Sequence, residues 1–242
     1  MAKGKLVFRW GVYLTAIIAV VLFYGKAGQA ATIYASADAT VKLGSTNNYG
    51  GDATALTGKD SGSTTNRIYV GFSLPTLDSG YEFASATLYG YYYWDTWDST
   101  DREHSWYRVV DDTWNEFTIN GTNAPVYSGS AIATWTPSGT SSGSSGHAYN
   151  TWQSWDILST LANETDGNLT LVLKQTDETL TFGIEQFRTI NYSDGSYGFK
   201  IEYETREIQQ PPPPQVPEPA TIILLLSGLI GLSGLRKKFN SR

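Results

Sequence analysis

The chain has 242 residues, a formal net charge of −6 at pH 7 and no cysteine. Without cysteine, disulfides and thiolate metal sites are excluded. Residues 31–205 hold 21 acidic and 8 basic side chains, a net charge of −13. Such an acidic surface argues against nucleic acid as a partner, because nucleic acid is bound through basic contacts to phosphate. The same residues include 7 Trp, 14 Tyr and 6 Phe.

The N-terminus has the anatomy of a secretory signal peptide. Basic residues precede an apolar run at 10–24, and the small residues Gly28 and Ala30 fit cleavage before Ala31. We therefore predict a signal peptide at 1–30. An uncleaved N-terminal anchor is the alternative, and both interpretations place the following residues outside the cytoplasm.

Residues 31–205 are numerous enough for one domain with a sizeable core. Their apolar period is two, and Gly, Asn, Asp and Ser separate short β-rich runs. These runs are Thr32–Tyr34, Ala39–Leu43, Ala53–Thr57, Arg67–Phe72, Ala84–Trp94, Ser105–Val110, Phe117–Ile119, Ala131–Trp135, Thr151–Trp155, Leu169–Lys174, Thr181–Phe187 and Gly198–Tyr203. Only Ile157–Asn163 is typical of a helix. The pattern predicts an all-β jelly-roll β-sandwich with one short helix.

Several short motifs follow one another through this domain. They are Ala37-Asp38-Ala39-Thr40-Val41, Asn48-Tyr49-Gly50, Arg67-Ile68-Tyr69-Val70-Gly71-Phe72, Ala84-Ser85-Ala86-Thr87-Leu88, Trp114-Asn115-Glu116, Asn123-Ala124-Pro125, Trp155-Asp156-Ile157, Phe182 and Glu185. Their order and spacing resemble the exported DNRLRE-type β-sandwich modules, which are related to carbohydrate-binding module family 96. The resemblance covers about 38–203 and implies a jelly roll that binds polysaccharide. Alginate-binding members carry several lysines in the strand after Tyr49, where this chain has only Lys59.

A row of tyrosines marks the first candidate site. Successive side chains of a strand point to opposite faces, so Tyr89, Tyr91 and Tyr93 share one face if Leu88 points into the core. Their spacing of about 6.8 Å suits a flat platform on which sugar rings stack. The alternative is that they are ordinary strand tyrosines, since aromatic residues favour strands.

The basic residues Lys42, Lys59 and Arg67 are the second candidate, because three of the eight basic side chains fall in the first third of the domain. By the family resemblance, this region contacts acidic sugars. A guanidinium binds a carboxylate in bidentate geometry and would suit a uronic acid. Isolated solubilising charges or structural ion pairs are the alternative.

Acidic residues gather in two places, the stretch 94–103 and the group Asp111, Asp112 and Glu116. Hard oxygen ligands in loops make Ca²⁺ possible, although the spacing does not match an EF-hand loop. A solvated acidic surface is the alternative. No other cofactor is expected.

Catalytic signatures are weak. With 21 acidic residues, a glycosidase-like carboxylate pair arises by chance. The Gly-x-Ser-x-Gly match at 139–143 lies in a Ser/Gly-rich loop without the strand-turn-helix context of a nucleophile elbow. His104 and His147 are the only histidines, too few for a three-histidine zinc site and not placed for a triad. We therefore expect no enzymatic activity.

The C-terminal segment begins with a linker at 206–215 that includes the four prolines 211–214. Consecutive prolines adopt an extended polyproline II helix and act as a semi-rigid spacer. The apolar run 220–235 has 16 residues without charge, and as a helix it would span roughly 24 Å of membrane.

Three features occur in order at 216–242: the motif Pro217-Glu218-Pro219, the apolar run, and the basic cluster Arg236, Lys237 and Lys238. The basic cluster would stay on the cytoplasmic side. Together they resemble the PEP-CTERM sorting signal of Gram-negative bacteria that make exopolysaccharide. In that family an exosortase recognises the Pro-Glu-Pro motif and processes the tail, and the proteins reach the cell surface or the biofilm matrix.

These observations predict an exported jelly-roll domain on a Pro-rich stalk, transiently anchored in the membrane through its C-terminal helix. Its expected partners are extracellular polysaccharide and an exosortase-type enzyme. Non-catalytic polysaccharide binding is the first hypothesis. A structural matrix protein without a specific glycan site is the second, and a polysaccharide-degrading enzyme is the third.

Overall fold

The computed structural model describes residues 28–95, 102–137, 150–180 and 183–211. The sorting tail at 216–242 and nearly all of the predicted signal peptide lie outside these residues. Within the described ranges, no helix combines the length and the apolar character needed to cross a membrane.

The described residues form strands and one single-turn helix, which confirms the predicted all-β class with one short helix. The elements are β1 (Ala30–Tyr34), β2 (Ala37–Lys42), β3 (Thr54–Lys59), β4 (Thr65–Ser73), β5 (Tyr81–Asp95), β6 (His104–Val109), β7 (Tyr127–Trp135), β8 (Thr151–Asp156), α1 (Leu158–Leu161), β9 (Asn168–Gln175), β10 (Gly183–Arg188) and β11 (Lys200–Glu207).

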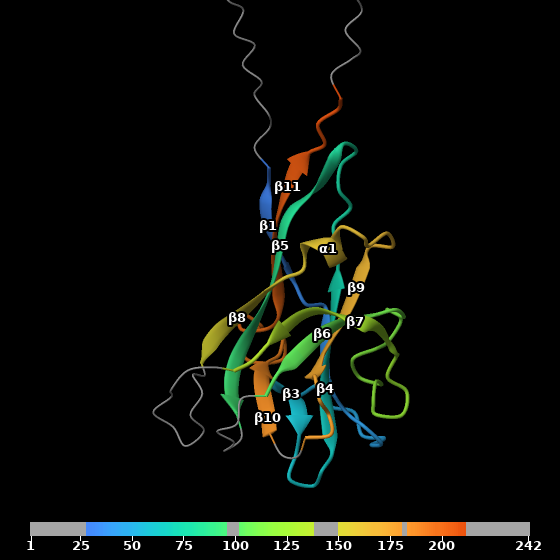
Figure 1. The fold of residues 1–242 in the computed structure, drawn as a ribbon, viewed down its shortest axis with the longest axis vertical. Coiled ribbons are helices and arrows are strands. Elements are labelled where there is room, and N and C mark those ends of the chain that lie inside the picture. The colour runs from blue at the N-terminus through green and yellow to red at the C-terminus, as the bar shows by residue number, and fades with distance from the viewer. Residues whose placement is uncertain (1–27, 96–101, 138–149, 181–182, 212–242) are drawn as a thin grey trace, which may run out of the picture.

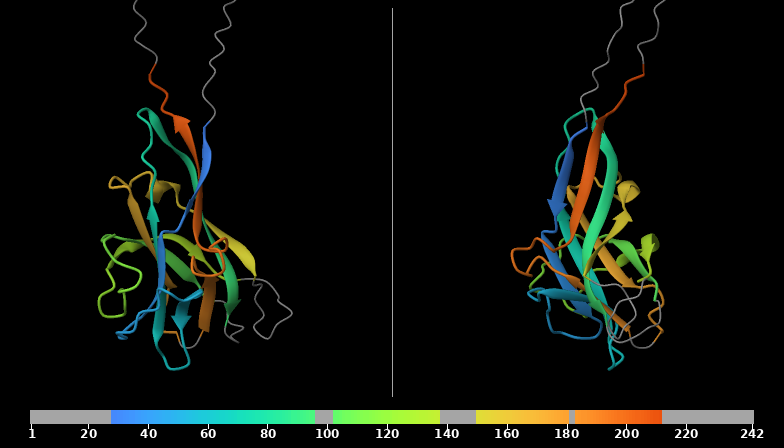
Figure 2. Two further views of the ribbon diagram at one scale, coloured as in Figure 1. Left: turned by 180° about the vertical axis from the view of Figure 1, so that it is seen from behind. Right: turned by 90° about the vertical axis from the view of Figure 1, so that its left-hand side faces the viewer.

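All strand pairs are antiparallel, in the order β1-β11-β5-β10-β3-β4-β9-β6-β7, with β2 paired to β4 and β8 paired to β5. The sheet curls, so that β4, β9 and β6 lie across from β5, β10 and β11 (Figures 1 and 2). This arrangement fits a β-sandwich. The inward residues of each half alternate with outward ones, as the period of two requires.

The larger core lies between the two halves of the curled sheet. Trp106 on β6 is completely buried there. Its ring centroid lies 5.3 Å from that of Trp155 on β8 and 5.8 Å from that of Phe199. Aromatic residues from both halves therefore hold the layers together.

A smaller core covers the outer face of β2, β4, β9 and β6. The segment 110–126 closes over it, and the Trp114 indole Nε1 donates a 2.9 Å hydrogen bond to Thr170 Oγ1 on β9. Ile119 inserts from the same segment and is 2% exposed. A surface loop is thereby part of the packed structure.

The predicted strand Phe117–Ile119 is wrong. Residues 116–118 form a turn, in which the Ile119 amide donates to the Asn115 carbonyl over 2.9 Å. Asn48 Nδ2 donates to the Ile119 carbonyl over 2.7 Å. In a strand, residues 117 and 119 would share a face, yet Phe117 is 64% exposed and Ile119 is buried. The apolar residues Phe117 and Ile119 therefore do not belong to a strand: one side chain is inserted into the smaller core and the other is exposed.

Gly90 on β5 lets Phe199 approach the strand closely. A Cβ at position 90 would lie 2.6 Å from Phe199 Cε1, which is closer than real Cβ contacts. Gly90→Ala is therefore expected to lower the free energy of unfolding by about 1–3 kcal/mol through overpacking, measured by urea denaturation. Gly129→Ala on β7 is the matched control, because no atom lies within 4 Å of its Cβ position. Equal stabilities of the two variants would contradict the close contact between Gly90 and Phe199.

Candidate functional site

The outer face of β5 carries two of the predicted tyrosines. Leu88 and Tyr92 are fully buried, whereas Tyr89 and Tyr91 are half-buried and point to the other side of the strand. The row is therefore not part of the core. Its exposed face continues onto the neighbouring strands.

Strand register brings two further residues to this face. Tyr91 pairs with Trp152 on β8, and Tyr89 pairs with Lys200 on β11. Paired residues of antiparallel strands point to the same side of the sheet. Trp152 and Lys200 therefore flank the tyrosines.

Four aromatic side chains gather here, and we call Tyr89, Tyr91, Trp152 and Tyr197 the aromatic platform. The Tyr91 ring meets Trp152 at 5.4 Å and Tyr197 at 4.7 Å between centroids, in both cases edge to face. The Trp152 and Tyr197 rings are within 13° of parallel, with centroids 6.4 Å apart. Trp152 is 38% and Tyr197 40% exposed, so the two parallel rings are open to a ligand.

Tyr93 has a different environment from the other two tyrosines. Phe187 pairs with Tyr92 and the preceding residue of β10 pairs with Trp94, so Tyr93 is the extra residue of a β-bulge. The guanidinium carbon of Arg188 lies 3.3 Å from the Tyr93 ring centroid and 3.6 Å from that of Tyr192. Among the described residues no carboxylate pairs with Arg188. Its guanidinium instead makes cation–π contacts with the two tyrosine rings.

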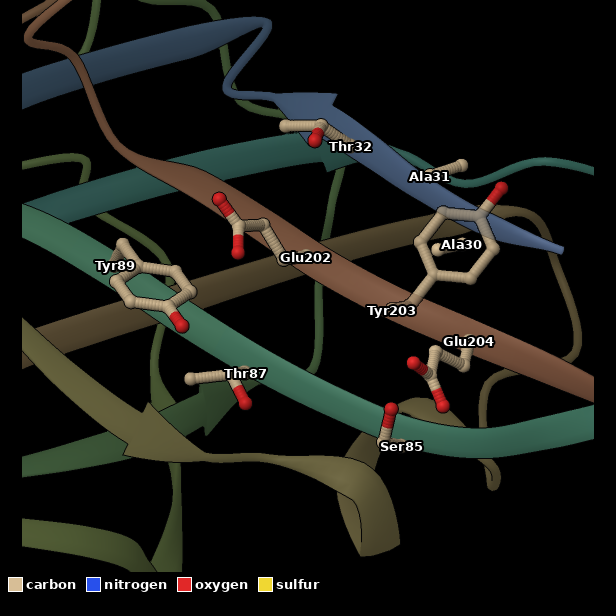
Figure 3. Close-up of a pocket in the computed structure, with 9 residues that line it drawn as sticks. All are labelled: Ala30, Ala31, Thr32, Ser85, Thr87, Tyr89, Glu202, Tyr203 and Glu204. Carbon is tan, nitrogen blue, oxygen red and sulfur yellow. The ribbon is translucent and has the colours of Figure 1, made fainter.

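A shallow groove of about 360 Å³ adjoins the platform along β5, β11 and β1. Figure 3 shows Ser85, Thr87 and Tyr89 along β5 beside Glu202 and Glu204 on β11. Tyr89 is thus common to the groove and the platform, and two carboxylates line the groove.

Lys200 lies between the groove and the platform. Its Nζ is 5.2 Å from the Tyr89 ring centroid, 5.0 Å from the Trp152 centroid and 2.6 Å from Glu202 Oε1. The ammonium is therefore shared between two rings and a carboxylate. At Lys200 the surface changes from the acidic side chains of the groove to the aromatic side chains of the platform.

Of the predicted basic trio, Lys59 and Arg67 converge on Glu178. Arg67 Nε and Nη2 donate to the two Glu178 carboxylate oxygens over 2.7 and 2.8 Å. The Lys59 ammonium donates to the Glu178 main-chain oxygen over 3.4 Å, and Lys174 Nζ is 3.7 Å from the carboxylate. The bidentate edge of Arg67 is therefore already occupied by a residue of the chain.

Lys42 is not brought to the same place. Val41 pairs with Arg67 in the β2–β4 ladder, so the next residue, Lys42, points to the opposite face. Its Nζ lies 4.5 Å over the ring of Tyr49.

The acidic residues predicted as Ca²⁺ ligands separate in the structure. Asp98 and Asp101 lie outside the described residues. The Glu116 carboxylate accepts a 2.8 Å hydrogen bond from Asn191 Nδ2, whereas Asp112 lies near Glu164 and Asp166. Among the described residues, Asp112 is the only predicted Ca²⁺ ligand that lies in a group of three carboxylates.

His104 is a buried side chain of β6. Its Nδ1 lies 3.0 Å from the Arg102 carbonyl oxygen, and burial lowers the pKa of the imidazole to about 4. A neutral imidazole in the core favours a structural role for His104. His147 lies outside the described residues.

Comparison with known families covers both parts of the chain. The model of the PEP-CTERM protein-sorting motif matches residues 215–238. A search of curated proteins gave no match. The model of carbohydrate-binding module family 96 matches residues 29–186, which include Tyr89, Tyr91 and Trp152. Both resemblances inferred from the sequence motifs are thereby confirmed. Because the match spans more than half of the 242 residues, the chain belongs to carbohydrate-binding module family 96.

Proposed function

We propose that this chain is a non-catalytic polysaccharide-binding protein at the surface, or in the biofilm matrix, of a Gram-negative bacterium. Membership of the family indicates carbohydrate binding, and the sorting motif indicates export through an exosortase-type system. The two halves of the curled sheet serve as the layers of a jelly roll, and the outer face of one layer binds the polymer.

The observation that carries this proposal is the exposed aromatic platform. The C–H faces of sugar rings stack on aromatic rings, and phenol hydroxyls bond to sugar hydroxyls. Trp152 and Tyr197 present nearly parallel rings, while the edge-on Tyr91 holds both in place. Aromatic side chains fixed by one another lose little conformational freedom on binding.

The charges beside the platform indicate which chemical class of polysaccharide it binds. Within the part of the chain that the structure describes, Arg188 forms no ion pair with a carboxylate, so its positive charge favours a carboxylate substituent of an acidic sugar. The carboxylates of Glu202 and Glu204 in the groove accept hydrogen bonds from neutral sugar hydroxyls. We infer a polymer that combines neutral residues with acidic ones.

The position of the termini agrees with display on a stalk. β1 begins and β11 ends side by side at one end of the molecule, whereas β10, which ends at Arg188, lies toward the other end (Figure 1). Glu207, near the start of the predicted linker 206–215, pairs with Tyr81 at the beginning of β5, whereas β10 pairs with residues 92–95 at the other end of β5. In the proposal, the exosortase-type enzyme processes Pro217-Glu218-Pro219 after the span 220–235 has held the chain in the membrane.

The test is affinity electrophoresis of the full chain, purified in mild detergent, through gels that contain neutral or acidic polysaccharides. The wild type should be retarded by a polymer that contains uronic acid. Trp152→Ala should weaken this binding about tenfold or more, since it removes a ring from the centre of the platform. Phe117→Ala is the matched control, because Phe117 is an exposed ring on a different surface, and it should bind as the wild type does.

Each alternative has its own outcome. Absence of retardation of the wild type by any polymer, including the producer's own exopolysaccharide, would support the structural matrix protein. Release of reducing sugar, or ultraviolet absorbance of unsaturated uronate during incubation with polymer, would support the polysaccharide-degrading enzyme.

A further inference from the structure

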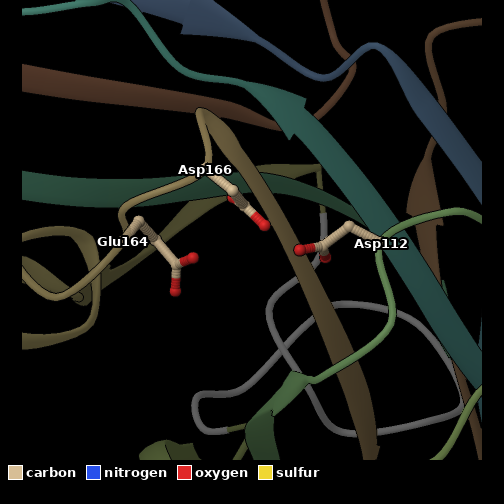
Figure 4. Close-up of side chains that lie close together, drawn as sticks. All are labelled: Asp112, Glu164 and Asp166. Atoms are coloured by element: carbon tan, nitrogen blue, oxygen red, sulfur yellow. The ribbon is translucent and has the colours of Figure 1, made fainter.

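Three carboxylates meet at a place that the aromatic platform does not use. Asp112 belongs to the segment between β6 and β7, while Glu164 and Asp166 belong to the turn between α1 and β9. One carboxylate oxygen from each lies within 4.8 Å of the other two. Figure 4 shows Asp112 and Asp166 pointing toward one another, with Glu164 beside them.

Arg108 on β6 forms hydrogen bonds with only one of the three carboxylates. Its Nε and Nη2 donate to both oxygens of Glu164, and its Nη1 donates to the Val109 carbonyl over 2.8 Å. The nearest approach to Asp112 is 3.6 Å, from Nη2 to Oδ2, which is too long for a hydrogen bond. Three carboxylates and one guanidinium leave a net charge of −2.

The environment of Asp112 independently indicates a cation-binding role. Its side chain is 7% exposed, and neither carboxylate oxygen has a hydrogen-bond partner. Burial of a carboxylate without hydrogen bonds is costly, and such groups in native proteins are matched by an ion or a water. Both oxygens of Asp112 are therefore available for a cation.

We propose that Asp112, Glu164 and Asp166 bind one Ca²⁺ ion. A Ca–O bond is about 2.4 Å long, so two oxygens bound to one ion are at most about 4.8 Å apart, and the three carboxylate oxygens here lie within that distance of one another. The ion neutralises the remaining charge of −2. Water completes its coordination, because Ca²⁺ takes six to eight oxygens.

The ion would fasten the segment 110–126 to the turn before β9. This segment covers the smaller core through Trp114 and Ile119, so Ca²⁺ binding would stabilise that core. The site shares no residue with the aromatic platform. The inference therefore stands apart from the proposed polysaccharide binding, and either can fail without the other.

The test uses the full chain in mild detergent after removal of divalent ions with EDTA. Isothermal titration with CaCl₂ should show one ion per chain. Thermal unfolding should shift upward by about 5–10 °C at a Ca²⁺ concentration 100 times the dissociation constant, because the ion binds only the folded state.

Asp112→Asn should abolish the Ca²⁺ shift and, in EDTA, be at least as stable as the wild type, since it removes a buried carboxylate charge that has no hydrogen bond. Asp111→Asn is the matched control. Asp111 is the exposed neighbour whose Oδ1 accepts a 3.0 Å hydrogen bond from the Thr113 amide, and asparagine keeps that acceptor, so the shift should remain. A wild-type melting temperature indifferent to millimolar Ca²⁺, or an unchanged shift in Asp112→Asn, would overturn the proposal.

Discussion

Trp106→Ala is expected to lower the free energy of unfolding by about 3–5 kcal/mol, the range for loss of a large buried aromatic side chain. Trp106 is fully buried between the two halves of the sheet and contacts Trp155 and Phe199. Its removal leaves a cavity that strands on both sides cannot close. Urea denaturation followed by far-ultraviolet circular dichroism would measure the change.

Two further variants test whether the loss of stability comes from the buried position of Trp106. Trp106→Phe should cost much less, because it keeps most of the ring and removes an indole Nε1 that has no hydrogen-bond partner. Trp152→Ala should change stability little, since that ring is 38% exposed. If Trp106→Ala cost no more than Trp152→Ala, the arrangement of the larger core described above would be wrong.

Asp38→Asn is expected to change the pH dependence of stability. Asp38 is completely buried, and its Oδ2 accepts a 2.9 Å hydrogen bond from the Ile190 amide while Oδ1 has no partner. Burial raises the pKa of Asp38 from 3.8 to about 7 in spite of that hydrogen bond, and the negative charge of Glu116 also raises it. The folded protein therefore keeps a proton that the unfolded chain has already lost.

The sign follows from this difference. A raised folded-state pKa gives stability that is fully present below pH 3.8 and is lost as the pH rises through 7. The loss is on the order of 4 kcal/mol. Asparagine has no proton to lose, so Asp38→Asn should gain stability relative to the wild type by about this amount between pH 4 and pH 8.

His104 acts in the opposite direction. Burial lowers the pKa of its imidazole from 6.5 to about 4, so its contribution is present above pH 6.5 and is lost as the pH falls through 4. Both groups contribute to the wild-type profile, as does Glu116, whose pKa is raised by burial. The difference between Asp38→Asn and wild type isolates Asp38, whereas a pH profile of the wild type alone does not.

Urea denaturation at pH 4, 6 and 8 would measure that difference. Asp111→Asn serves as the control, because the hydrogen bonds from Thr113 lower the pKa of the exposed Asp111, and its titration lies below this pH range. Its curve should run parallel to that of the wild type. A constant difference between Asp38→Asn and wild type across the three pH values would refute the prediction.

The sequence by itself determined the fold class and the inward and outward sides of β5. Alternation along a strand is a local property, so Leu88 against Tyr89 and Tyr91 could be assigned before the layers were known. The sorting motif at 215–238 is likewise a linear signal. The prediction of a strand at Phe117–Ile119 was wrong. Two apolar residues at a spacing of two do not distinguish a strand from a turn with one inserted side chain.

Only the tertiary structure decided which residues join the site. Trp152 lay in a predicted strand, but the pairing of β8 with β5 placed it beside Tyr91, and a loop brought Tyr197 to both rings. Arg67 binds Glu178, which is 111 positions away in the sequence, and Asp112 lies close to Glu164, which is 52 positions away. Such contacts depend on strand order and sheet curvature, which arise from packing of the whole domain and leave no periodic trace in the local sequence.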